Sequence, residues 1–164
     1  MSDFSIFMAG NVVESEIYEY PASKRYLTNE PELDENGEKI VTGKDAKGNP
    51  IYKMKPVNWK IKAIDSDLDE ALRKDCTKKV PSGKRGQFTQ ELDTDKYIGK
   101  MCVACTVYPD LNNAELQDSY KVKSADALLK RMLLPGEYTD YKSKVMEVNG
   151  YDMSMEELVD EAKN

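Results

Sequence analysis

Cys102 and Cys105 form the only motif in this sequence whose spacing could support thiol chemistry or metal binding. A redox-active C-x-x-C pair needs a thiolate that is stabilised at the exposed amino-terminal end of a helix. Here both cysteines fall inside an apolar segment that predicts a helix over residues 95–106. Cys76 as a third ligand would still leave zinc without a fourth thiolate or a histidine. We therefore interpret these cysteines as buried core thiols.

The other candidate motifs fail at positions that their chemistry requires. Segment 82–86 (SGKRG) superficially matches a phosphate-binding loop, but position 78 is lysine instead of glycine and position 85 is arginine instead of a hydroxyl residue. The oxygen-rich segments 34–38 and 110–113 lack the spacing of a calcium loop, and we interpret them as turns. The sequence contains no histidine, which removes Ser-His and Cys-His nucleophile pairs. We expect no catalytic, cofactor-binding or metal-binding residue, and predict that the chain is not an enzyme.

Length and charge exclude further classes of protein. The 164 residues are typical of one domain, which we place over 1–164. With 24 basic against 30 acidic residues the net charge is -6, which disfavours general nucleic-acid binding. No apolar run approaches the roughly 20 residues of a membrane-spanning helix, and the first residues lack the basic start of a signal peptide. We therefore expect a cytosolic protein that binds neither nucleic acid nor membranes.

The elements that would position any functional residue are strands first and helices later. Residues 12–20 and 58–64 predict strands, the second with Trp59 and Ile61 on one face. Between them, residues 29–57 are polar and contain two turn signals, which predicts a mobile hairpin or loop insertion, with disorder as the alternative. Ser66 is expected to cap a helix, and Asp93 to cap the helix over 95–106.

Three short amphipathic helices are predicted after residue 124. Ser124 can cap the first, Asn149-Gly150 ends the second, and the third is expected over 154–163. The fold class predicted from these patterns is α+β, with a mainly helical body and a small antiparallel sheet formed by the N-terminal half. The apolar stripes must be buried against the chain's own core or against a partner.

Two segments are candidates for partner binding. The terminal helix carries Met155, Leu158 and Val159 on one face. The basic loop after residue 78 places Lys84 and Arg85 close to Phe88, which suits an acidic partner, although a simply solvated loop explains the same charges. An apolar terminal face also suits self-association, so a homo-oligomer is left open.

Several segments, in order and over most of the chain, resemble the XkdN-like family of phage tail assembly chaperones. They are SDFSIFMAGNVVE, YPASKR, ALRKDCTKKV, GKRGQFTQELDTDKYIGKMCVACTVYPDLNNAELQDSY, ALLKRMLLPGEYTDYKSKVMEVNGY and EELVDEAKN. The family occurs in contractile-tailed phages and prophages of Gram-positive bacteria. The stretch Glu30–Met54 is the least typical part.

The resemblance implies a chaperone that works in the host bacterial cytoplasm. Such a protein would bind the tape measure protein, keep it soluble during tail tube assembly, and be absent from the mature particle. The family has no catalytic residues to transfer to this sequence, so the six contact candidates above rest on pattern alone. Two alternatives are a virion structural component of the tail or neck, and a small thiol enzyme that uses Cys102 and Cys105.

Overall fold

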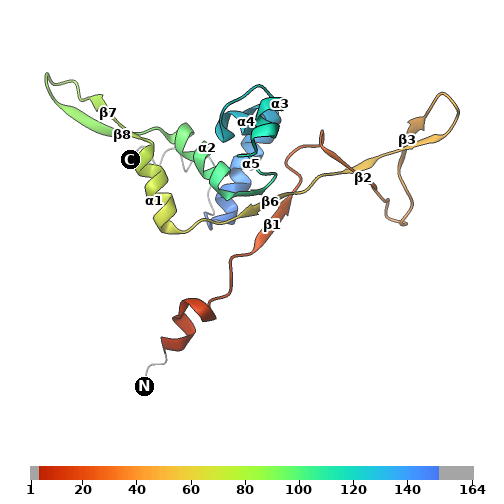
Figure 1. Ribbon diagram of the computed structural model, residues 1–164, viewed down its shortest axis with the longest axis horizontal. Helices are drawn as coiled ribbons and strands as arrows, with labels where there is room; N and C mark the ends of the chain where they lie inside the picture. The colour runs from red at the N-terminus through yellow and green to blue at the C-terminus, as the bar shows by residue number, and fades with distance from the viewer. Residues whose placement is uncertain (1–3, 152–164) are drawn as a thin grey trace.

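A computed structural model describes residues 4–151 of the chain. Figure 1 shows a central body of helices from which three segments extend: the N-terminal segment, a long ribbon of paired strands that contains β2 and β3, and the hairpin β7–β8. The expected terminal helix over 154–163, with Met155, Leu158 and Val159, lies outside the described residues.

A small antiparallel sheet forms one side of the body, with strand order β1 (Ile17–Tyr20), β6 (Trp59–Lys62) and β9 (Thr106–Tyr108). The alternation predicted from the sequence is present, because Trp59 and Ile61 are buried while Lys60 is exposed. The first strand is shorter than the predicted 12–20. Strand β9 was not predicted, because Thr106 was included in the preceding helix.

Helices α1 (Ser66–Asp75) and α2 (Thr94–Cys105) begin at side-chain caps. Asp93 caps α2 as predicted, its carboxylate accepting from the backbone N–H of Lys96 at 3.2 Å. The cap of α1 is Asp65, which accepts from the Leu68 N–H at 2.8 Å, so the assignment of the cap to Ser66 was wrong by one residue. Both side chains are good caps, and only the backbone conformation distinguishes them.

The remaining helices are α3 (Ala114–Ser119), α4 (Ala125–Met132) and α5 (Pro135–Val148). The Ser124 hydroxyl accepts from the Ala127 N–H at 3.2 Å and caps α4 as predicted. Pro135 occupies the first turn of α5, where its missing N–H leaves no unsatisfied donor. Gly99 lets α5 approach α2 closely, since a Cβ at that position would lie 3.3 Å from the Tyr138 hydroxyl.

The hydrophobic core lies between the sheet and these helices. Its largest fully buried side chains are Trp59, Ile61, Met101, Leu128, Leu129, Tyr141 and Val145. Trp59 and Tyr141 pack edge to face with their ring centroids 5.3 Å apart, which joins the central strand to α5. The apolar faces predicted for α4 and α5 are therefore buried within this chain.

The ribbon comprises β2 (Leu27–Pro31), β3 (Val41–Lys44), β4 (Pro50–Tyr52) and β5 (Met54–Pro56), with β2 paired to β5 and β3 paired to β4. It covers the range in which a hairpin or loop insertion was predicted. Its base is fastened to the end of α4: the Arg25 guanidinium donates to the Met132 carbonyl at 2.7 Å, and the Tyr26 hydroxyl donates to the same oxygen at 2.9 Å. These donors satisfy a carbonyl that the helix leaves unpaired.

The second extension is the hairpin β7 (Thr77–Pro81) and β8 (Phe88–Leu92), paired without interruption from Thr77 opposite Leu92 to Pro81 opposite Phe88. The sequence predicted only a basic loop here. The run of lysines hides the period-two pattern, since no face of this two-stranded hairpin is buried.

The predicted fold class is therefore wrong in its proportions. The chain is not a mainly helical body with a sheet from its N-terminal half; it is a mixed structure in which several small antiparallel sheets are spread over the chain. β9 comes from beyond α2 and completes the central sheet, and β7–β8 lies between α1 and α2.

Candidate protein-interaction surfaces

The three cysteines are free thiols packed in the core. Cys102 and Cys105 have no exposed surface, and burial raises the pKa of both thiols. The Cys105 sulfur also accepts a hydrogen bond from the Asn149 amide at 3.3 Å. A raised pKa keeps the thiol protonated near neutral pH, which opposes nucleophilic or redox chemistry. The interpretation as core thiols agrees with this geometry.

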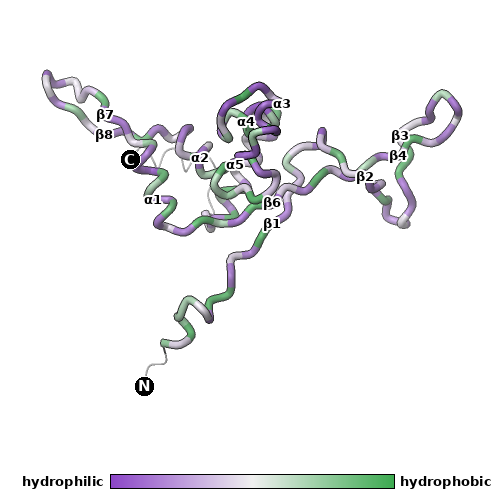
Figure 2. Tube along the Cα trace, viewed as in Figure 1, coloured by the Kyte–Doolittle hydropathy of each residue, from purple (hydrophilic) through white to green (hydrophobic). Residues whose placement is uncertain are grey.

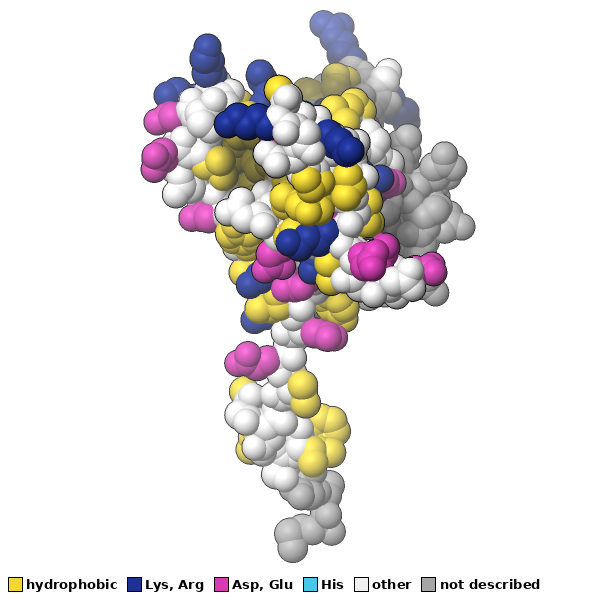
Figure 3. All heavy atoms as spheres, turned by 90° about the vertical axis from the view of Figure 1, so that its right-hand side faces the viewer, with side chains coloured by type: hydrophobic (Ala, Val, Ile, Leu, Met, Phe, Trp, Pro, Cys, Tyr) yellow, Lys and Arg dark blue, Asp and Glu magenta, His cyan; other side chains and the backbone are white. Residues whose placement is uncertain are grey.

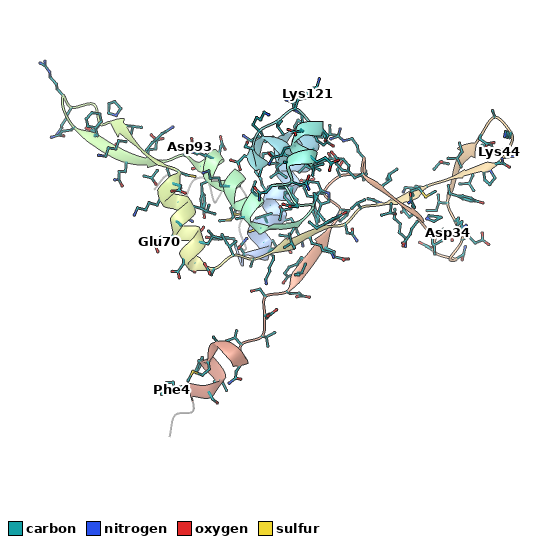
Figure 4. All side chains as sticks on the ribbon, viewed as in Figure 1. Phe4, Asp34, Lys44, Glu70, Asp93 and Lys121 are labelled. Atoms are coloured by element: carbon teal, nitrogen blue, oxygen red, sulfur yellow. The ribbon has the colours of Figure 1, made fainter. Side chains whose placement is uncertain are left out.

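The acidic turns that could be mistaken for ion sites use their carboxylates locally. Asp34, labelled in Figure 4, accepts from the backbone N–H groups of Asn36 and Glu38, both at 2.9 Å. Asp110 accepts in the same way from the N–H of Asn112 at 3.0 Å. Within residues 4–151, no group of three or more His, Cys, Asp or Glu side chains could hold a metal ion. These carboxylates shape turns.

The tip of hairpin β7–β8 brings together the three contact candidates that lie within the described residues. Lys84 and Arg85 are exposed in the turn, and Phe88 opens the returning strand with 65% of its surface accessible. Between 77 and 92 the chain carries four basic side chains and one acidic side chain, Glu91, a local charge of +3 on a protein of net charge -6. The tip is therefore a basic surface with an aromatic side chain at its edge.

A hollow of about 630 Å³ lies in the ribbon, bounded by residues of both strand pairs, and we call it the ribbon groove. Its lining residues are Lys24, Leu27, Glu32, Thr42, Tyr52, Lys53, Met54 and Pro56. Glu32, which directly follows β2, forms an ion pair at 3.1 Å with Lys53, which directly precedes β5. Figure 3 views the ribbon end-on and shows apolar side chains gathered there with Lys and Arg around them.

The N-terminal segment is the surface that the sequence analysis missed. It contains two short 3₁₀ helices, η1 (Phe4–Phe7) and η2 (Ala9–Asn11), and stands away from the body (Figures 1 and 2). Its exposed apolar side chains are Phe4, Ile6, Phe7, Met8, Val12 and Val13. Figure 4 places Phe4 at the far end of this segment. The sequence could have indicated this exposed apolar surface, because an apolar run without an amphipathic period has no polar face to turn toward water.

A family model described as the phage XkdN-like tail assembly chaperone protein matches residues 25–163. The chain belongs to this family. Protein XkdN of the phage-like element PBSX, from Bacillus subtilis strain 168, is 30% identical over 99% of this chain and 94% of its own. YqbN of the same organism is 33% identical over 99% of this chain and 93% of its own. A crystal structure of YqbN matches with a TM-score of 0.64 and 28% identity, covering 93% of this chain and 99% of that chain.

Membership in the XkdN-like family establishes the general role of the chain as a phage tail assembly chaperone. A chaperone of this kind interacts with phage tail proteins, and the family favours a non-enzymatic role. Among residues 4–151 no helix is both long and apolar enough to cross a membrane. The exposed surfaces described above are therefore candidates for protein contact.

Proposed function

We propose that this XkdN-like chain binds the tape measure protein of its own phage or prophage in the host bacterial cytoplasm. Binding keeps the tape measure protein soluble while the tail tube assembles, and the chaperone is absent from the mature particle. Family membership supports a partner among the tail proteins. The contact with that partner is expected at side chains that the fold leaves exposed.

The observation that carries this proposal is the tip of hairpin β7–β8. Phe88 is a large apolar side chain that takes no part in the core, and it lies beside the basic residues Lys84 and Arg85. A polypeptide with apolar and acidic residues on one face would bury Phe88 and pair with these cations. The remaining contact candidates, Met155, Leu158 and Val159, lie beyond the described residues and are proposed as a second contact.

Charge explains how such a complex stays in solution. The hairpin carries a charge of +3, so the remainder of the chain carries -9 and the whole chain has a net charge of -6. The hairpin can therefore bind an acidic, apolar surface while the negative charge of the remainder keeps the complex in solution. A basic binding surface separated from an acidic remainder suits a protein that covers an aggregation-prone partner.

Co-expression with the tape measure protein from the same genome tests the proposal. We expect a soluble complex by affinity capture and size-exclusion chromatography, and aggregation of the tape measure protein when this chain is omitted. Mass spectrometry of purified particles should not detect the chain. An insoluble tape measure protein with this chain eluting alone would contradict the holdase role, and recovery of the chain from particles would favour a structural component of the tail or neck.

Truncation after Tyr151 separates the two proposed contacts. Tyr151 is retained because its backbone N–H donates to the Met146 carbonyl at 3.1 Å and closes the end of α5. If the terminal segment contributes, the truncated chain should capture less tape measure protein while keeping its thermal unfolding temperature. Equal capture by both forms would assign the contact to the hairpin alone.

A further inference from the structure

The N-terminal segment exposes apolar side chains that could bind in an apolar groove. A 3₁₀ helix has about three residues per turn, so Phe4 and Phe7 of η1 lie on the same side. Their side chains are 66% and 74% exposed. Residues 4–16 contain two carboxylates, Glu14 and Glu16, and no basic residue. The segment is thus an apolar stretch followed by negative charge.

The ribbon groove has the complementary features. Leu27, Tyr52, Met54 and Pro56 give it an apolar lining. Its volume of about 630 Å³ falls within the range of about 300–1,000 Å³ usual for pockets that enclose a ligand. Lys24 contributes a positive charge to the wall, whereas the charge of Lys53 is already paired with Glu32. An apolar ligand followed by carboxylates matches this arrangement.

In both Figure 1 and Figure 3 the N-terminal segment stands apart from the ribbon of its own chain. We propose that residues 4–13 of one copy bind the ribbon groove of a second copy. Phe4 and Phe7 enter the apolar part of the groove, and Glu14 and Glu16 lie toward Lys24. This contact covers the largest group of exposed apolar side chains in the described part of the chain, which explains how a soluble chaperone tolerates them.

The two surfaces differ from one another, so the contact is heterologous. Each copy that inserts its segment into a neighbour still offers its own groove to a third copy, and the assembly grows as an open chain or closes as a ring. This self-association does not depend on the proposed binding of the tape measure protein. It would let several copies line up along an elongated partner.

Sedimentation velocity of the full chain, without any tail protein, tests the proposal over a series of concentrations. We expect the mass to rise from 18.6 kDa toward multiples of that value. The double substitution Phe4→Ser and Phe7→Ser removes the ligand, and Leu27→Glu places a charge in the groove. Because Phe4, Phe7 and Leu27 are all more than half exposed, both variants should keep the fold, which circular dichroism checks.

Each variant alone should stay at the mass of one chain, since neither can form the contact with itself. A mixture contains one intact segment and one intact groove, so it should form a complex of two chains and nothing larger. Phe88→Ser is the matched control, because it also removes an exposed phenylalanine (65% exposed) but lies on hairpin β7–β8, away from the proposed contact. This variant should assemble as the unsubstituted chain does. Three results would overturn the proposal. The unsubstituted chain could remain a monomer at every concentration, or the Phe4 and Phe7 substitutions could leave its assembly unchanged. The mixture of the two variants could also fail to form a complex.

Discussion

Trp59 and Tyr141 meet edge to face, with ring centroids 5.3 Å apart and ring planes inclined by 70°. The contact joins the central strand β6, which directly follows the ribbon, to helix α5 near the end of the described chain. Tyr20 and Tyr26 pack beside the same pair, at 6.2 Å from Tyr141 and 6.5 Å from Trp59. This aromatic cluster holds the base of the ribbon against the helical body.

Trp59→Ala should lower the free energy of unfolding by about 3–5 kcal/mol, because it removes a fully buried aromatic side chain and leaves a cavity. Urea unfolding followed by far-ultraviolet circular dichroism measures the change. Phe88→Ala is the control, since an exposed aromatic side chain should alter stability by no more than about 0.5 kcal/mol. Equal losses in both variants would contradict the placement of Trp59 in the core.

Asn149→Ala should lower the free energy of unfolding by about 1–3 kcal/mol. The side-chain oxygen of Asn149 (Oδ1) accepts from the Ile64 N–H at 3.0 Å, and its side-chain nitrogen (Nδ2) donates to the Val145 carbonyl at 2.8 Å. Alanine leaves the part-buried Ile64 N–H without this acceptor. Asn112→Ala, at an exposed turn position, should be close to neutral in the same urea titration. Equal stability of the Asn149 variant and the unsubstituted chain would show that water replaces these bonds at no cost.

The native thiols should react slowly with an alkylating reagent near neutral pH, because Cys102 and Cys105 are buried and protonated. Addition of urea at the same pH should make all three cysteines react at the rate of free thiols. Mass spectrometry of the labelled chain gives both rates. Rapid labelling of Cys102 in the folded protein would revive the thiol-enzyme alternative.

Stability should fall as pH rises above about 8.5, the ordinary pKa of an unfolded cysteine thiol. Burial raises the pKa of the three thiols in the folded state, so the folded chain keeps protons that the unfolded chain releases. Tyr97 and Tyr141, whose pKa values are also raised by burial, extend the loss above about pH 10. Urea midpoints across this range measure the effect, and Cys102→Ala should make the loss shallower. A midpoint that rises with pH would contradict the burial of these groups.

Substitution of both Lys84 and Arg85 by glutamate should weaken capture of the tape measure protein in the co-expression assay, because the tip then repels an acidic partner. The unsubstituted chain should also lose binding as salt is raised, whereas the variant should respond less. The double substitution Lys44→Glu and Lys47→Glu, at exposed positions of the ribbon, changes the total charge by the same amount and is the control. Equal losses in the variant and the control would show that overall charge, and not the hairpin tip, governs binding.

Much of the helical structure could be predicted because its signals are local. Asp93 and Ser124 cap helices where the sequence places them, and the apolar positions of α4 turn inward at Leu128 and Leu129. The alternation of Trp59, Lys60 and Ile61 likewise indicated a half-buried strand. Each of these signals lies within one or two turns of chain, where spacing and capping chemistry determine the outcome.

The amount and distribution of β-structure could not be predicted, because they depend on strand pairings that local sequence patterns do not reveal. Strand β9 exists because Thr106 and Tyr108 pair with β6, more than forty residues earlier in the chain. Hairpin β7–β8 is exposed on both faces along nearly all its length, so it carries no hydrophobic alternation. The sequence could indicate the basic residues of the tip but not the hairpin that presents them.

The sequence by itself determined the family, the absence of histidine chemistry, the acidic character and most helix starts, because these depend on residue identity and short spacing. Only the tertiary structure decided which apolar residues are buried in the core and which remain exposed to solvent. Leu128 and Phe4 are both apolar, yet Leu128 on α4 is fully buried in the core and Phe4 is exposed on the N-terminal segment. Whether a residue is buried depends on the side chains that pack against it, and these come from elements distant in the chain.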